Sequence, residues 1–165
     1  MPFLKGKDKM VTPFVDFEID TTHSLNQLIT KTNTTSSLCK VKITQDLLLE
    51  GRWYKPSSTS YYGIITSLEI PAQEISNITY SSSETTLFRA YRYDLFNSNK
   101  IYNALDLKIT SNYIYLNVNN GQGTVYEVYK CDWSGNVTTD RRGYSTSMML
   151  PTGEMYQYVL YLKKS

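Results

Sequence analysis

The feature that most limits the fold of this chain is a set of Tyr-rich segments in which aromatic and β-branched residues recur at every second position. These segments are 113–118, 124–133 and 155–162. A period of two matches the alternation of side chains across a β-strand, and residues of these types suit a pleated surface with a buried face. The pattern predicts an all-β scaffold. No set of catalytic residues lies within these segments.

Shorter alternating segments extend the prediction to the rest of the chain. Further strands are expected at 15–19, 39–43, 61–70, 75–80, 86–93 and 105–110, and a continuation of the second of these to Leu49 is left open. The pair Asn120-Gly121 indicates a hairpin, because both residues tolerate a positive φ. No period of 20–50 residues repeats. We therefore expect a single β-sandwich of jelly-roll-like topology, with a barrel as the alternative.

One short helix and one arm complete the predicted organisation. Leucines and an isoleucine have helical spacing within residues 22–30, behind Thr22 and Ser24 as capping candidates. Residues 1–12 contain Pro2, Gly6 and alternating lysines, which predict a flexible N-terminal arm. Residues 13–165 are then expected to form the β-sandwich domain, since 165 residues suit a single core.

The predicted surface is polar but weakly charged. Charged residues make up 19% of the chain, below the usual ~25%, and Ser, Thr and Asn take their place. A net charge of +2 is too small for a general nucleic-acid binder. Neither a signal peptide nor an apolar stretch long enough to span a bilayer is found in the sequence. We expect no nucleic-acid partner and no membrane association.

The two cysteines permit at most one disulfide. Cys39 shares a strand face with Val41 and Ile43, and Cys131 shares one with Tyr129 and Trp133, so we expect two buried free thiols. There is no CxxC pair that would indicate a zinc site.

Candidate catalytic groups are sparse. His23 is the only histidine, and it lies in a polar turn rather than beside an evident nucleophile and acid. Glycoside cleavage would need two carboxyl groups that flank one bond. The candidate pairs for that role are Glu127 with Asp132 and Glu69 with Glu74. Most acids alternate outward on strands, so we expect no enzymatic activity.

One loop has a weak likeness to a calcium site. Asp132, Ser134, Asn136 and Asp140 have the spacing D-x-S-x-N-x-x-x-D, but no glycine or glutamate stands where an EF-hand loop needs it. An ordinary turn between two strands explains the same residues. We expect neither a metal nor a cofactor.

The tyrosines leave two interpretations open. Their rings suit subunit interfaces and sugar platforms alike. In 113–118 and 155–162 both strand faces are partly apolar; either the rings fill a small core, or a second face is covered by another subunit. As a stacking platform for a sugar, the candidates are Trp53, Tyr61, Tyr62 and Trp133.

The chain resembles small bacteriophage virion proteins of the decoration, neck, baseplate or fibre-attachment type. The resemblance rests on the start at Met1–Met10, on the turn 132–139 and on the strands rich in Ser, Thr, Asn and Tyr. It implies a non-enzymatic, symmetric assembly component located in the virion. Its expected partners are copies of itself and other virion proteins.

Two functions follow as hypotheses. In the first, the chain is a virion subunit whose N-terminal arm contacts its neighbours through the residues Pro2, Phe3, Leu4, Lys5, Lys7 and Lys9. The alternative is a carbohydrate-binding β-sandwich module or receptor-binding domain, with a cell-surface glycan as its partner.

Overall fold

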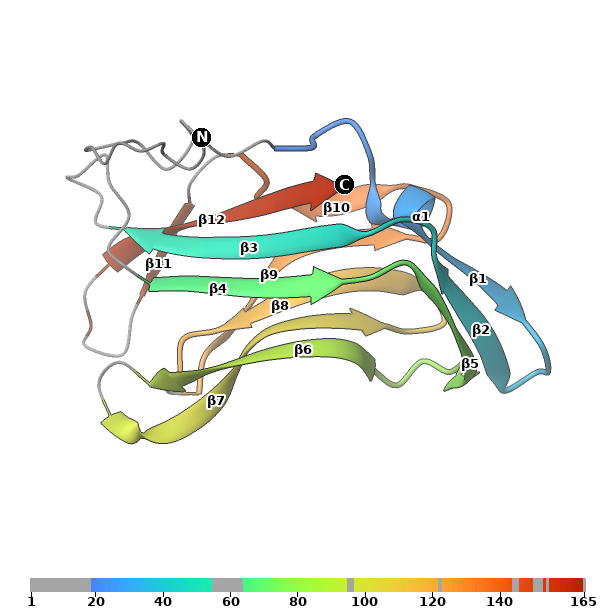
Figure 1. Ribbon diagram of the computed structural model, residues 1–165, viewed down its shortest axis with the longest axis horizontal. Coiled ribbons are helices and arrows are strands. Elements are labelled where there is room, and N and C mark those ends of the chain that lie inside the picture. The colour runs from blue at the N-terminus through green and yellow to red at the C-terminus, as the bar shows by residue number, and fades with distance from the viewer. Residues whose placement is uncertain are drawn as a thin grey trace.

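The described part of the protein is mostly antiparallel β-strand, as the sequence predicts (Figure 1). The computed structural model describes residues 19–54, 64–94, 97–121, 123–143, 146–149, 153 and 155–164. In that part of the chain the strands form three sheets, and α1 (Leu25–Leu28) is the one helix. The expected arm 1–12 and most of the expected strand 15–19 lie outside the described residues.

The four-stranded sheet has the order β11-β12-β3-β4. Its strands are β3 (Leu47–Tyr54), β4 (Ile64–Ile70), β11 (Thr146–Met149) and β12 (Met155–Lys164). One edge of β12 pairs with β3 along its length. The other edge is covered by β11, then by the Arg142–Leu160 bridge, then by Asp20, whose N–H donates to the Leu162 carbonyl at 2.7 Å. As a result β12 is an interior strand along both edges.

The five-stranded sheet has the order β10-β9-β8-β7-β6, so strands that follow one another in the chain are neighbours. Its strands are β6 (Thr85–Asp94), β7 (Asn97–Ile109), β8 (Tyr113–Asn119), β9 (Val125–Asp132) and β10 (Val137–Asp140). Pairing between β7 and β8 runs from Leu105 to Ile109. Among the described strands, the earlier part of β7 pairs with β6 alone.

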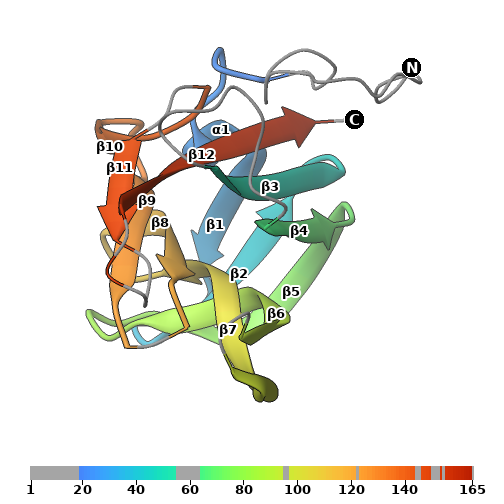
Figure 2. The same cartoon turned by 90° about the vertical axis from the view of Figure 1, so that its left-hand side faces the viewer.

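The three-stranded sheet is β1 (Ile29–Asn33), β2 (Leu38–Ile43) and β5 (Gln73–Thr79), in the order β1-β2-β5. It lies at the end of the molecule where α1 lies (Figure 1). In Figure 2, β12 and β3 lie above the interior, β6 and β7 below it, and β8 and β9 at the left. All three sheets contribute to one hydrophobic cluster, in which Ile29, Leu49 and Leu107 are fully buried.

The helix prediction for 22–30 is only partly correct. The helix ends at Leu28, and Ile29 already belongs to β1, which pairs with β2 from Ile29 to Asn33. Thr30 and Thr32 are β-branched, and ladder pairing in a sheet outweighs the helical spacing of the apolar residues. The predicted hairpin between β8 and β9 is confirmed, but of its central pair only Gly121 has a positive φ.

The apolar second face of the C-terminal strands is covered within the chain itself. Val159 and Tyr161 point away from the core cluster, and both are 0% exposed. The Arg52 guanidinium lies 4.8 Å from the centre of the Tyr161 ring. On β8, Tyr115 has the same orientation and is only 6% exposed. These side chains therefore do not require a second subunit to cover them.

Candidate functional site

A polar groove lies where the three-stranded sheet meets the end of the β8–β9 pair. Lys31 of β1 and Tyr80, which follows β5, form one side. The β7–β8 turn contributes Ser111, Asn112 and Tyr113, and the end of β9 with its following turn contributes Asp132, Trp133 and Ser134. The hollow has a volume of about 440 Å³. We call it the Trp133 groove.

Two aromatic rings and one ammonium group are held together in the Trp133 groove. The Lys31 Nζ lies 4.5 Å from the centre of the Tyr80 ring and 5.3 Å from that of Trp133, within the range of cation–π attraction. The Trp133 indole N–H donates to the Thr110 carbonyl at 3.2 Å, which fixes the ring. The Lys31 Nζ also donates to the Asn33 side-chain oxygen at 3.2 Å.

Asp132 is engaged by its own turn. One carboxylate oxygen accepts the backbone N–H groups of Ser134 and Asn136, each at 2.9 Å, and the other accepts the Asn136 side-chain amide at 2.8 Å. The side-chain and backbone hydrogen bonds from Asn136 are the main reason that the pKa of Asp132 is lowered. Asp140 forms an ion pair with Arg142 at 2.8 Å. The two carboxylates of the calcium-like sequence thus bind different partners, and residues 132–136 form a turn between β9 and β10.

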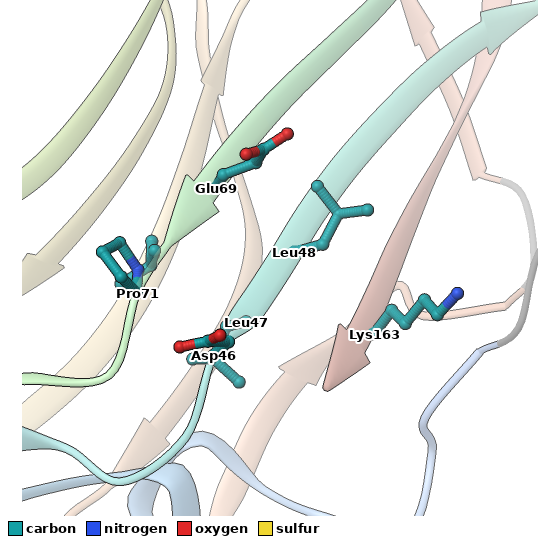
Figure 3. A pocket seen from close by; sticks show the side chains of 7 residues that line it. Asp46, Leu47, Leu48, Glu69, Pro71 and Lys163 are labelled. Atoms are coloured by element: carbon teal, nitrogen blue, oxygen red, sulfur yellow. The ribbon is translucent and has the colours of Figure 1, made fainter. Parts of the chain in front are cut away.

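A second hollow, of about 480 Å³, lies on the outer side of the four-stranded sheet (Figure 3). Glu69, Leu48 and Lys163 stand in one row across β4, β3 and β12, because Leu48 is paired with both of the others. Asp46 closes the hollow beside Pro71, and its carboxylate accepts the Ala72 N–H at 2.8 Å. The charges on either side of Leu48 are of opposite sign.

His23 belongs to a structural cluster around a buried arginine. Both the Asp20 carboxylate and the Thr22 hydroxyl contact the same ring nitrogen of His23, Nδ1, at 3.1 and 3.0 Å. A catalytic triad needs the acid on one ring nitrogen and the nucleophile on the other. This arrangement orients the imidazole but does not connect a nucleophile to the acid.

Arg142 is the centre of that cluster, and the sequence analysis did not identify it. It is 5% exposed, and its guanidinium forms an ion pair with Asp140 and donates to the backbone carbonyls of Asp20 and His23. The same group lies 4.9 Å from the centre of the Tyr129 ring. The Tyr129 hydroxyl in turn accepts the Leu25 N–H at 3.1 Å. Nothing in the local sequence distinguishes Arg142 from its neighbour at position 141.

The candidate pair Glu127 and Asp132 is too widely spaced for a glycosidase site. Glu127 is opposite Asn117 and Asp132 is opposite Tyr113. Four residues of β8 separate these positions, or about 13 Å along a strand, more than the ~5–9.5 Å that glycosidases use. Glu69 is on the four-stranded sheet, whereas Glu74 is on the three-stranded sheet.

The proposed sugar platform is wrong for Trp53 and stays a prediction for Trp133. Trp53 is 2% exposed in the core, where its ring packs edge-on against Tyr158 with the centroids 4.8 Å apart. The Trp53 ring has no face available to a ligand, because Trp53 lies on the face of its strand that packs on the core. Tyr61 and Tyr62 lie outside the described residues, as do the arm residues Pro2 to Lys9. Cys39 and Cys131 are both buried and free, as expected.

A protruding ribbon is the other feature that sequence reasoning missed. Among the strands that the structure describes, the part of β7 that precedes Leu105 pairs with the end of β6 alone. These two segments form a two-stranded ribbon that extends away from β8 at the lower left of Figure 1. Tyr91 is paired with Asn103 and Tyr93 with Ile101, so Tyr91 and Ile101 are diagonal neighbours on one face. Their exposed fractions are 62% and 56%. We call this the β6–β7 ribbon.

Comparison of the chain with protein-family models, with curated proteins and with solved structures found no match. Among the described residues there is no group of three or more His, Cys, Asp or Glu side chains placed to hold a metal ion. In the same part of the chain, no helix has the length and apolar character needed to cross a membrane.

Proposed function

We propose that this protein is a non-enzymatic structural subunit of a bacteriophage particle, which assembles through contacts with other copies of itself and with other virion proteins. The observation that carries the proposal is the β6–β7 ribbon. A two-stranded ribbon is only marginally stable on its own in water. This one exposes more than half of both Tyr91 and Ile101, and packing of those side chains on a neighbouring copy would stabilise it.

The composition supports the same proposal. Tyrosine is enriched at protein interfaces, while Lys, Glu and Asp are depleted there. Low overall charge also reduces the cost of desolvating the contact. The resemblance of the turn 132–139 to hairpins of phage tail and fibre proteins points in the same direction. We therefore expect the ribbon, rather than β12, to provide the self-contact.

The sandwich architecture is part of the proposal. The four-stranded and five-stranded sheets share one core, which supports two packed layers. Within the five-stranded sheet, β6 to β10 are neighbours in chain order. That order supports a meander rather than a jelly roll, because a jelly roll is built from Greek keys in which the fourth strand returns beside the first.

The experiment is sedimentation velocity of the whole chain over a range of concentrations. The wild-type chain should associate, and the double variant Tyr91→Ser/Ile101→Thr should be monomeric. Val137→Thr is the matched control, since Val137 is 41% exposed on β10, at the opposite edge of the same sheet. It should associate like the wild type.

Two results contradict the proposal: a wild-type chain that is monomeric at every concentration, or a double variant that associates as well as the wild type. The virion assignment has its own test, which is mass spectrometry of purified particles of the virus that encodes the chain. Absence of the chain from those particles contradicts the virion assignment even if self-association is found.

A further inference from the structure

The Trp133 groove has the composition of a ligand site rather than of a subunit contact. It is concave, and it combines aromatic rings with a small number of polar groups, as small-molecule sites do. β1, which carries Lys31 of the groove, lies at the end of the molecule opposite the β6–β7 ribbon (Figure 1). We propose that the groove binds an acidic saccharide, whose carboxylate pairs with Lys31 while a sugar ring lies against the aromatic side chains.

The charge in the groove selects the ligand class. The Asp132 carboxylate keeps its negative charge, but both of its oxygens already accept hydrogen bonds within the turn. Lys130 lies 3.8 Å from Glu127 and 4.0 Å from the centre of the Tyr113 ring. Among the described residues Lys31 forms no ion pair, and its ammonium contacts only the Asn33 amide oxygen and two neutral rings. An ammonium group has three N–H donors, so Lys31 retains donors for an anionic ligand.

The rings supply the second half of the recognition. Tyr80, Tyr113 and Trp133 all line the groove. Tyr and Trp present an apolar ring together with a polar tip, which matches a sugar ring that has an apolar face and a rim of hydroxyl groups. The Trp133 ring is fixed by its bond to Thr110, so little conformational entropy is lost when a ligand packs on it.

Polar side chains at the mouth of the groove complete the site. Within the described part of the chain, the side chains of Ser111, Asn112 and Ser134 make no hydrogen bonds, although their backbones are fixed. The Thr110 hydroxyl accepts the N–H groups of Asn112 and Tyr113, and the Ser111 N–H donates to the Ser81 carbonyl. The backbone of these residues is thus held in place, and their hydroxyl and amide groups are available to sugar hydroxyls.

The proposal is tested by titrating the whole chain with two trisaccharides that differ only at C6, tri-galacturonic acid and the neutral galactose trimer. Binding is followed by isothermal titration calorimetry and by Trp fluorescence, in which Trp133 responds while the core residue Trp53 does not. The acidic trimer should bind more tightly by at least about tenfold, the factor that corresponds to one charge-assisted hydrogen bond.

Lys31→Met isolates the charge, because methionine keeps the unbranched apolar stem. It should reduce affinity for the acidic trimer to that for the neutral one. Lys42→Met is the matched control on the adjacent strand of the same sheet, where Lys42 is exposed and opposite Thr30, and it should bind like the wild type. Asn112→Ala, an exposed turn position, should weaken both trimers equally.

Three results overturn the proposal. The first is no binding of the acidic trimer at millimolar concentration, and the second is equal affinity for the neutral trimer. The third is unchanged affinity in Lys31→Met with an unchanged circular dichroism spectrum. If Lys31→Met fails to fold, Asn112→Ala decides, since loss of binding in that variant supports the groove and retention of binding contradicts it.

Discussion

The side chain of Tyr158 occupies the space that a Cβ atom on Gly51 would need. An added Cβ would overlap the Tyr158 hydroxyl oxygen and the ring carbon that carries it. Gly51 lies on β3 opposite Leu160, and Tyr158 lies two positions away on β12, opposite Trp53. The absence of a side chain at position 51 is therefore what allows Tyr158 to pack across β3 into the core.

Gly51→Ala should reduce the free energy of unfolding by roughly 1–3 kcal/mol, the usual cost of overpacking a core. The ring of Tyr158 is fully buried and has no free space in which to move aside. Urea unfolding followed by circular dichroism measures the change. An unchanged free energy of unfolding would show that Tyr158 can adopt another rotamer.

Tyr158→Phe should change the free energy of unfolding by less than about 1 kcal/mol. The buried Tyr158 hydroxyl has no hydrogen-bond partner among the described residues. Its removal therefore breaks no bond and relieves an unsatisfied polar group. The same urea titration applies. A loss of several kcal/mol would reveal a partner for that hydroxyl.

Arg142→Met should cost about 3 kcal/mol of unfolding free energy, because it leaves the partners of a buried charge without a donor. Hydrogen exchange should accelerate at Asp20 to Leu28, the segment that the guanidinium holds through two backbone carbonyls. Glu127→Gln is the comparison, since its pair with Lys130 is partly exposed and 3.8 Å long. That variant should lose less than about 1 kcal/mol. Equal losses in the two variants would contradict the role given to Arg142.

Cys39 and Cys131 should not react with Ellman's reagent in the folded protein, and both should react in denaturant. Both side chains are buried, and this burial raises the pKa of each thiol and so disfavours the reactive thiolate. Reaction of either thiol at the rate of a free peptide cysteine, without unfolding, would show that the core opens there.

Acid should destabilise the protein partly through Asp132. Its folded-state pKa is lowered, so its contribution is present above the unfolded value of about 3.9 and is lost as the pH falls through the folded value. Asp132→Asn keeps an oxygen acceptor for the turn but cannot titrate. The melting temperature of this variant should fall less steeply below about pH 4 than that of the wild type. Parallel curves would assign the acid sensitivity to other carboxyl groups.

Strands were predictable wherever apolar and polar residues alternate along the sequence. Segments such as 39–43 and 113–118 have this period and form β2 and β8. The continuation to Leu49 is wrong, because Leu47 already begins β3 in another sheet. The start of β7 and the whole of β10 lack an apolar alternation, and the sequence analysis missed them; β10 also lies at the edge of its sheet. Their strand structure follows from pairing with β6 and β9, which is not encoded locally.

The groove was only partly predictable for a related reason. Trp133 is a candidate from residue type alone, but so was Trp53, which is fully buried in the core, whereas Trp133 is half-buried and lines the groove. What separates them is the packing of the three-stranded sheet beside the β9–β10 turn, which brings Lys31 and Tyr80 to Trp133. Arg142 acquires its role in the same way, from segments that are distant in the sequence.

The interior position of β12 also bears on how the protein folds. Residues 47–54 gain their second neighbour in the sheet only when residues 157–164 arrive. Pairing over such long sequence separations slows folding, because the entropy of closing the loop is lost before the stabilising contacts form. Until then one edge of β3 offers unpaired N–H and C=O groups to any other nascent chain. We therefore expect the nascent chain to be prone to aggregation at high expression levels, as the practical consequence of placing this strand in the middle of its sheet.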